Sequence, residues 1–259
     1  MTFDQYIDNP MGKSNAVFAA RDAYKAQYME KFDALYMREA GKITHRLYYD
    51  KGNMNYYIYL KIPSETVKDF YYDVVIKFYT KDNGLKAAPT LKDYDVQFFS
   101  NDPAFVYTYM YVFRKYNLLI EELKSKCPAA SLKQSPTERN FYETPGYVKS
   151  LYFAYIFMKR VSLFTRSAYE FNGQKYSKSA LLNQISSFDN KMRERDDKSK
   201  KQKAAERKTA KKENNVKPVK GTPKKNIGVV KTVHSTPTAS KVNRTKLTKK
   251  AMINSNKPK

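Results

Sequence analysis

Cysteine is almost absent from this 259-residue chain, whose only example is Cys127. A single cysteine excludes an intrachain disulfide and cannot supply the several thiolates of a zinc or iron–sulfur centre. Cys127 precedes Pro128 and has no histidine near it in the sequence. We therefore expect it to fill a small buried position, as free cysteine commonly does, in a protein of a reducing compartment.

Histidine is nearly as scarce, because the chain contains only His45 and His234. His45 lies in an alternating run with Ile43 and Leu47, and no acid or nucleophile is identifiable as its partner. We interpret it as a hydrogen-bonded histidine of a sheet. His234 lies in a basic segment without aromatic residues, so neither histidine predicts a catalytic or metal site.

Paired acidic residues are few, and none has the context of an active site. Glu122 and Lys124 have the E-x-K spacing of metal-dependent nucleases, and Asp93 and Asp95 form a second pair. Two-metal chemistry needs carboxylates that converge on the cations, whereas positions i and i+2 of the helix expected here point apart. We predict no enzymatic activity, no cofactor and no metal site.

A phosphate-binding loop is also not expected. Gly12-Lys13-Ser14 imitates the end of that motif, but its first glycine position is occupied by Ile7 and no apolar strand precedes it. The glycine turn needs that context to present backbone N–H groups to phosphate. A helix cap is the better interpretation of these three residues.

Long apolar runs are missing as well. No uncharged run approaches the ~20 residues of a membrane-spanning helix. The first residues, MTFDQYIDNPMGK, contain acids and lack the apolar stretch of a secretory signal. We expect a soluble protein with no membrane partner.

The last 62 residues of the chain lack aromatic residues and contain only two acidic ones. All 38 Tyr and Phe residues lie at or before Phe188, and residues 198–259 hold 20 Lys and Arg residues against Glu206 and Glu213. This segment carries +18 of the net charge of +24. A segment that repels itself and has little apolar surface should stay unfolded until it meets a polyanion.

The basic segment predicts a type of partner. Lys outnumbers Arg by 18 to 2, which favours non-specific contact with phosphates through counterion release over the reading of base edges. An acidic protein surface remains an alternative partner. The residues that we select as contacts to nucleic acid are Lys198, Lys200, Lys201, Lys203, Arg207, Lys208, Lys211, Lys212, Lys217, Lys220, Lys224, Lys225, Lys249 and Lys250.

The aromatic-rich part alternates between helical and strand periodicity. The pattern predicts helices over 15–40, 103–116, 118–126, 146–161 and 179–188, and strands over 43–49, 56–62, 70–78 and 94–98. Four consecutive strands favour an α+β fold, with a mainly antiparallel four-stranded sheet packed with several helices. We predict an α+β body over 1–190, a basic helical extension over 191–215, and a disordered Lys-rich tail over 216–259.

Tyrosines on one side of the predicted sheet leave two interpretations open. Tyr48, Tyr57, Tyr59, Tyr71 and Tyr79 lie opposite the apolar face. Exposed aromatic residues on a sheet can stack on bases. The alternative, which we favour, is that helices or a second subunit cover this face, because tyrosine is common at interfaces.

Four stretches give the chain a resemblance to a known family. They are NPMGKSNAVFAARDAY (9–24), FYYDVVIKFYT (70–80), DYDVQFFSNDPAFVYTYMYVF (93–113) and PGYVKSLYFAYIFMKR (145–160). Together they resemble virion structural proteins of tailed bacteriophages, over residues 1 to about 170. The resemblance implies a particle component that assembles with other virion proteins, located in the virion and in the host cytoplasm during assembly.

Two functions follow as hypotheses. The first is a non-enzymatic structural component of a phage virion, which self-assembles or assembles with partners through its aromatic-rich body and contacts DNA non-specifically with its basic tail. The second is a free-standing, non-specific nucleic-acid-binding protein that acts in phage DNA replication or packaging.

Overall fold

The computed structural model describes residues 1–8, 15–39, 43–80, 90–136, 140, 143, 145–146, 148–165 and 174–214, without the side chains of 15–24 and 211–214. The chain divides into two compact units, Met1–Asn215 and Val216–Lys259. All described residues belong to the first unit. The motif Gly12-Lys13-Ser14 and the predicted disordered tail lie outside the described residues.

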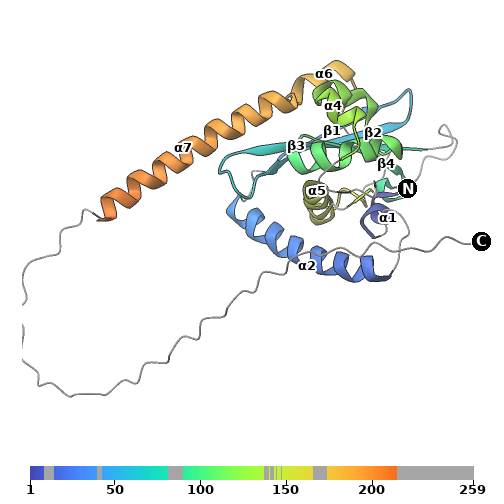
Figure 1. The fold of residues 1–259 in the computed structure, drawn as a ribbon. Helices are drawn as coiled ribbons and strands as arrows, with labels where there is room; N and C mark the ends of the chain where they lie inside the picture. Colours follow the sequence, from blue (N-terminus) through green and yellow to red (C-terminus); the bar gives the residue numbers. More distant parts are fainter. Residues whose placement is uncertain are drawn as a thin grey trace, which may run out of the picture. The chain divides into compact units, whose positions relative to one another are not determined.

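A five-stranded sheet forms the centre of the first unit, in the order β4-β3-β2-β1-β5 (Figure 1). Its strands are β1 (His45–Asp50), β2 (Asn55–Pro63), β3 (Tyr71–Tyr79), β4 (Asp95–Ser100) and the two-residue β5 (Gln174–Lys175). The first four pair antiparallel, whereas β5 pairs parallel with β1. The predicted α+β fold with a four-stranded antiparallel sheet is therefore confirmed, and β5 extends the sheet at the β1 edge.

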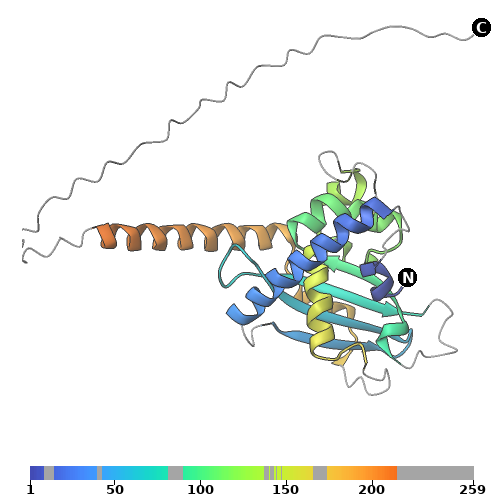
Figure 2. The same cartoon turned by 90° about the horizontal axis from the view of Figure 1, so that it is seen from below.

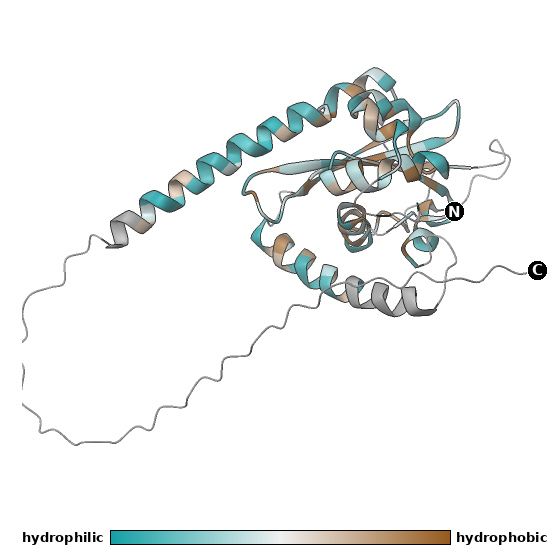
Figure 3. Ribbon diagram, viewed as in Figure 1, coloured by the Kyte–Doolittle hydropathy of each residue, from teal (hydrophilic) through white to brown (hydrophobic). Residues whose placement is uncertain are grey.

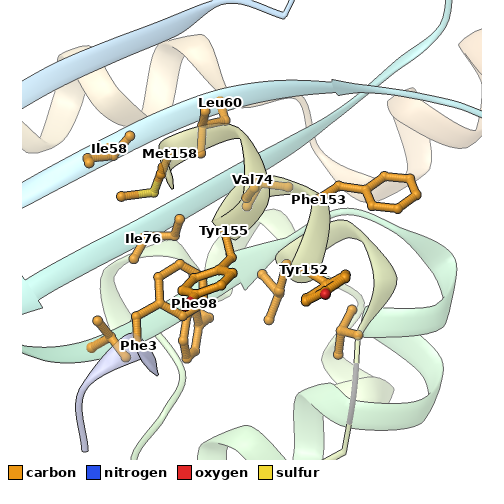
Figure 4. Close-up of a cluster of buried hydrophobic side chains, with 14 of the residues drawn as sticks. Phe3, Ile58, Leu60, Val74, Ile76, Phe98, Tyr152, Phe153, Tyr155 and Met158 are labelled. Carbon is orange, nitrogen blue, oxygen red and sulfur yellow. The ribbon is translucent and has the colours of Figure 1, made fainter. Parts of the chain in front are cut away.

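Helices α5 (Lys149–Arg160) and α2 (Asn15–Arg38) cover one face of the sheet. Figure 2 shows α5 crossing the strands, and Figure 1 shows that α5 lies between the sheet and α2. Side chains of α5 such as Met158 and Tyr155 lie against Ile58 and Ile76 of the sheet (Figure 4). Nine consecutive residues of α5, from Ser150 to Met158, are buried, which agrees with the expectation that this helix lies at the centre of the core.

Helix α6 (Lys178–Gln184) and the 3₁₀ helix η3 (Glu121–Lys126) lie on the other face. They contribute Leu181 and Leu123 to a second cluster with Tyr57 and Tyr59 of β2. The strands are thus buried on both sides, and both sets of alternating residues are core.

Several elements differ from the predicted ones. Helix α1 (Phe3–Asp8) was not predicted, the short helix α4 (Ala129–Lys133) lies in a predicted loop, and a π-helical turn η2 (Phe105–Tyr109) precedes α3 (Met110–Lys115). The predicted helix over 118–126 is wrong in its first part. Leu119 instead forms a parallel bridge with Phe98 of β4, because the backbone groups at this sheet edge need partners.

The long basic helix α7 (Phe188–Asn214) follows α6 after a break. The predicted helix over 179–188 is wrong in its last part, because α6 ends at Gln184 and Phe188 begins α7. Ser187 caps the new helix, since its Oγ accepts a hydrogen bond from the N–H of Asn190 at 3.4 Å. The predicted end of the helix near Asn214 agrees with the observed end.

Candidate nucleic-acid interface

The start of α7 is held on the sheet by a buried carboxylate. Asp73 of β3 is 1% exposed, and its Oδ1 accepts a hydrogen bond from the Tyr59 hydroxyl at 2.7 Å. Its Oδ2 accepts bonds from Asn101 Nδ2 at 2.8 Å and from the Ser186 N–H at 3.3 Å. The ammonium of Lys191, which is itself buried, lies 3.9 Å from the same oxygen. A buried charge is tolerated only when it is paired and hydrogen-bonded, and Asp73 meets both conditions.

The next turns of α7 dock on the start of β3 through polar groups. Lys198 Nζ donates to the Asp69 carbonyl oxygen at 2.6 Å, and Gln202 Oε1 accepts from the Lys68 N–H at 3.2 Å. The ring of Phe70 lies under two ammonium groups, 5.2 Å from Lys191 Nζ and 5.9 Å from Lys198 Nζ. Such cation–π contacts contribute about 0.5–2 kcal/mol each, depending on how far the cation is desolvated.

A polar cavity of about 260 Å³ lies where α7, the start of α5 and the turn after β4 meet. It is lined by Arg195 and Asp102, and by Lys149, which pairs with Glu65 at 2.5 Å. Burial raises the pKa of the Asp102 carboxyl, although the Ala104 N–H, Lys149, Ser150 and Arg195 oppose that shift. Positive and negative side chains balance here, so the cavity has no excess charge that would select an anion.

Beyond Gln202, the described side chains of α7 leave the body. Residues 203–210 are all exposed, and Figure 3 shows the helix as hydrophilic along most of its length. The local sequence supports this helix, because alanine, lysine, arginine and glutamate are good helix formers. Pairs within the helix add to its stability, including Glu194 with Lys198 at 2.8 Å and Gln202 with Glu206 at 3.1 Å.

The predicted contact residues fall into three groups in this structure. Lys198 is engaged with the body and with Glu194, so its charge is partly satisfied. Five other residues, Lys200, Lys201, Lys203, Arg207 and Lys208, are exposed on α7. Lys211 and Lys212 belong to α7 without described side chains, and Lys217, Lys220, Lys224, Lys225, Lys249 and Lys250 lie outside the described residues.

The sequence did not reveal the docking residues Lys191 and Arg195. Phe188, Lys191, Arg195, Lys198 and Gln202 recur at spacings of three and four, which is the pattern of one helix face. After Phe188 that face carries polar and cationic residues, so a pattern based on apolar residues does not show its helical periodicity. The signal that would have found this face is a series of Lys and Arg residues at spacings of three and four that begins at the last aromatic residue of the chain.

The tyrosines of the sheet are core residues. Tyr48, Tyr57 and Tyr59 are 1%, 1% and 3% exposed beneath α6 and η3. Tyr57 stacks on Tyr176 with ring centroids 4.3 Å apart, and Tyr71 is half-buried with its hydroxyl 3.4 Å from Glu39 Oε2. The interpretation that helices cover this face is therefore confirmed for Tyr48, Tyr57 and Tyr59, whose rings are not available to stack on bases, whereas Tyr71 and Tyr79 are half-buried.

The other residues singled out from the sequence have structural partners. Glu122 accepts a hydrogen bond from Lys77 Nζ at 2.8 Å, whereas Lys124 pairs with Glu121 at 3.4 Å, so the E-x-K residues do not converge. Burial opposes ionisation of the Glu122 carboxyl, but hydrogen bonds from Lys77 and Tyr57 lower its pKa. The Asp pair is also split, because Asp93 accepts from the Thr90 hydroxyl and Asp95 pairs with the N-terminal ammonium.

The sequence interpreted Cys127 as a small buried residue and His45 as a histidine of the sheet. Cys127 is half-buried, and burial raises the pKa of its thiol to about 12. This agrees with an inert cysteine that packs as a small apolar residue. His45 is the first residue of β1 and pairs with Leu60 of β2, so it is a residue of the sheet as predicted; its side chain is exposed, with the ring 5.6 Å from that of Phe157.

Groups of acidic, histidine or cysteine side chains that would suit a metal ion are not found among the described residues. None of the described helices combines the length and the apolar character needed to span a bilayer. Comparisons with protein-family models, with curated proteins and with solved structures found no match to this chain.

Proposed function

We propose that the chain binds nucleic acid non-specifically through α7 and the Lys-rich residues that follow it. The observation that carries this proposal is the series of exposed cations on α7 beyond its last contact with the body, from Lys203 to Lys208. These side chains have no apolar surface to cover and are free to meet phosphates. Binding through them releases counterions and is insensitive to base sequence.

We further propose that the protein is a non-enzymatic structural component of a bacteriophage virion. Its resemblance to virion structural proteins supports this role, as does a body made largely of packed aromatic residues. Tyr107 offers a surface for assembly, since it is 63% exposed beside a groove of about 700 Å³ lined by Pro103, Pro128 and Pro136. Exposed aromatic residues are enriched at subunit contacts.

Mass spectrometry of purified particles tests the structural role. We expect the chain in washed virions at a fixed ratio to the other particle proteins. Its absence from virions, together with its presence on DNA in infected cells, would favour the alternative of a free-standing nucleic-acid-binding protein that acts in replication or packaging.

Two variants test the binding role. A chain that ends at Asp197 loses every selected cation, and we expect it to lose salt-sensitive binding to DNA while circular dichroism shows a folded body. The second variant is the full chain with glutamine at Lys200, Lys203, Arg207 and Lys208, which leaves the docking contacts of α7 in place. Unchanged affinity in both variants, or binding that does not weaken with salt, would contradict the proposal.

A further inference from the structure

The exposed part of α7 separates its charges onto two halves of the helix. Successive residues of an α-helix are rotated by about 100°, so positions three, four and seven apart share a face. On this basis the residues of the cationic half are Lys200, Lys201, Lys203, Ala204, Arg207 and Lys208. The opposite half holds Gln202, Ala205, Glu206, Thr209 and Ala210, which include an acid and no cation. Every one of these side chains is exposed except the half-buried Gln202.

The body lies on the side of the opposite half, which has no cation. A recess of about 620 Å³ separates Lys68 and Asp69 from α7, and Ala205, Glu206 and Thr209 line its helical wall. Lys201, at the boundary between the two halves, also reaches this recess. The N–H of Lys68 bonds Gln202 on the same side. The centre of the cationic half therefore points away from the body.

The composition of the cationic half selects the partner. A partner helix would need apolar residues at regular positions, and between residues 199 and 210 the apolar residues of α7 are alanines alone. A rigid polyanion, in contrast, meets a straight helix on one side only. Double-stranded DNA has a persistence length of about 150 base pairs and presents one charge per ~1.7 Å of its axis. The ~12 Å between Lys200 and Lys208 thus spans a length of duplex whose two strands together carry about seven phosphates.

We propose that α7 contacts double-stranded DNA with its cationic half alone, the opposite half remaining turned toward the body. The inference rests on the proposed binding of nucleic acid, to which it adds the contacting face and the form of the ligand. A flexible single strand can wrap around the helix and reach both halves. A stiff duplex cannot do so, and an experiment can therefore show which half of α7 it contacts.

Two neighbouring alanines supply a matched pair of variants. Ala204 lies in the middle of the cationic half and Ala205 lies in the opposite half, and both are exposed. Ala204→Lys and Ala205→Lys change the composition, the net charge and the helix propensity of the full chain equally. They differ only in the direction in which the new ammonium points.

The experiment measures the affinity of the full chain for a 30-base-pair DNA duplex between about 50 and 200 mM salt, the range over which phosphate contacts change affinity strongly. For Ala204→Lys we expect several-fold tighter binding at low salt and a log–log slope that is steeper by about one, as one added phosphate contact requires. Ala205→Lys should match the unsubstituted chain in both. Circular dichroism of both variants checks that the helix is retained.

Each other outcome overturns a defined part of the proposal. Equal steepening by both variants on the duplex would mean that DNA reaches both halves, so the one-sided contact is wrong while non-specific binding stands. Absence of salt-dependent binding by the unsubstituted chain would overturn the proposed function as well. On a single-stranded oligonucleotide of the same length, we expect both variants to steepen the slope equally. A difference that persisted there would show that duplex stiffness is not what selects the face.

Discussion

Asp73 carries the largest concentration of buried polar contacts in the described structure. Its carboxylate joins Tyr59, Asn101 and Ser186 to the ammonium of Lys191, and each partner comes from a different element or connection of the chain. Loss of this carboxylate is costly, because it removes the acceptor of Tyr59, Asn101 and Ser186 and leaves the buried Lys191 ammonium with Glu194, at 3.3 Å, as its ion partner.

Replacement of Asp73 by alanine should therefore destabilise the fold by about 3 kcal/mol or more, the usual range for breaking a buried ion pair. The measurement is the midpoint of urea unfolding, followed by circular dichroism. The double variant Asp73→Asn with Lys191→Met should recover most of the loss, because no unpaired charge stays buried. Asp196→Asn, on an exposed residue of α7, serves as the control and should change stability by less than about 0.5 kcal/mol. A small effect of Asp73→Ala would mean that the pair of Lys191 with Glu194 compensates for the lost carboxylate.

Gly146 supplies a second prediction at the scale of a single residue. A Cβ atom at this position would lie 2.3 Å from Cε1 of the Tyr109 ring, and the carbonyl oxygen of Gly146 accepts the Tyr6 hydroxyl at 2.8 Å. Because the added Cβ would collide with the Tyr109 ring, which packs on Phe113 at a centroid distance of 6.3 Å, Gly146→Ala should cost about 1–3 kcal/mol of unfolding free energy, as overpacked sites do. Gly52→Ala is the matched control, since its Cβ would lie an ordinary 3.5 Å from Asp50. If the two variants unfold at the same urea concentration, Tyr109 must move at little cost.

The thiol of Cys127 gives a prediction on pH. Its pKa in the folded chain is about 12, raised by burial from an ordinary value near 9. The thiolate is the reactive form, so at pH 8 the folded protein should react with iodoacetamide about a thousandfold more slowly than the unfolded chain. The rate should increase about tenfold for each unit of pH until the pH approaches the folded pKa. Mass spectrometry of the alkylated peptide, with and without urea, measures both rates. Similar rates in the two conditions would contradict a buried thiol.

At the scale of elements, local patterns predicted most helices and strands. The caps at Asp102 and Ser177 belong to such local patterns, because each side chain accepts a hydrogen bond from an N–H two or three residues ahead, that of Ala104 and that of Ala180 respectively. The strands were identifiable because both of their faces are core, which leaves long alternating runs of aromatic and branched residues.

The elements that the sequence did not predict depend on distant partners. Helix α1 is stabilised by the packing of Phe3 and Tyr6 against Phe98, with ring centroids 5.0 and 4.7 Å away. The break between α6 and α7 depends on the bond from Ser186 to Asp73, more than 100 residues earlier. No local pattern contains such information. For the same reason the exposed cations of α7 were identifiable from composition, whereas the docking role of Lys198 was not.

Docking of α7 supplies the prediction that belongs to this scale. Phe70 is fully buried and lies under the ammonium groups of both Lys191 and Lys198. Phe70→Leu keeps an apolar residue in place but removes the ring that both cations face. We expect hydrogen exchange in residues 191–202 to become at least several-fold faster than in α5, because the first turns of α7 open locally.

The control for this experiment is Phe105→Leu, which removes an equally buried ring without a cation over it. It should speed exchange through loss of global stability, without a selective effect on α7. If Phe70→Leu also speeds exchange without a selective effect on α7, the cation–π contacts do not hold the start of α7. The contacts to Asp73 then hold it.

At the scale of the whole molecule, the division after Asn215 predicts that residues 216–259 can be removed without loss of the stability of the first unit. The first unit contains both described clusters of core residues, and residues 216–259 add 12 Lys and Arg residues without an acid. A chain that ends at Asn215 should therefore melt within about 2 °C of the full chain, less than the 2–4 °C expected for a loss of 1 kcal/mol at this size.

The chain that ends at Asn215 should still bind DNA, because the exposed cations of α7 remain, but with a shallower dependence on salt. The chain that ends at Asp197 should bind more weakly than either. A large loss of melting temperature after removal of 216–259 would mean that this segment packs on the body, and an unchanged salt dependence would mean that DNA contacts α7 alone.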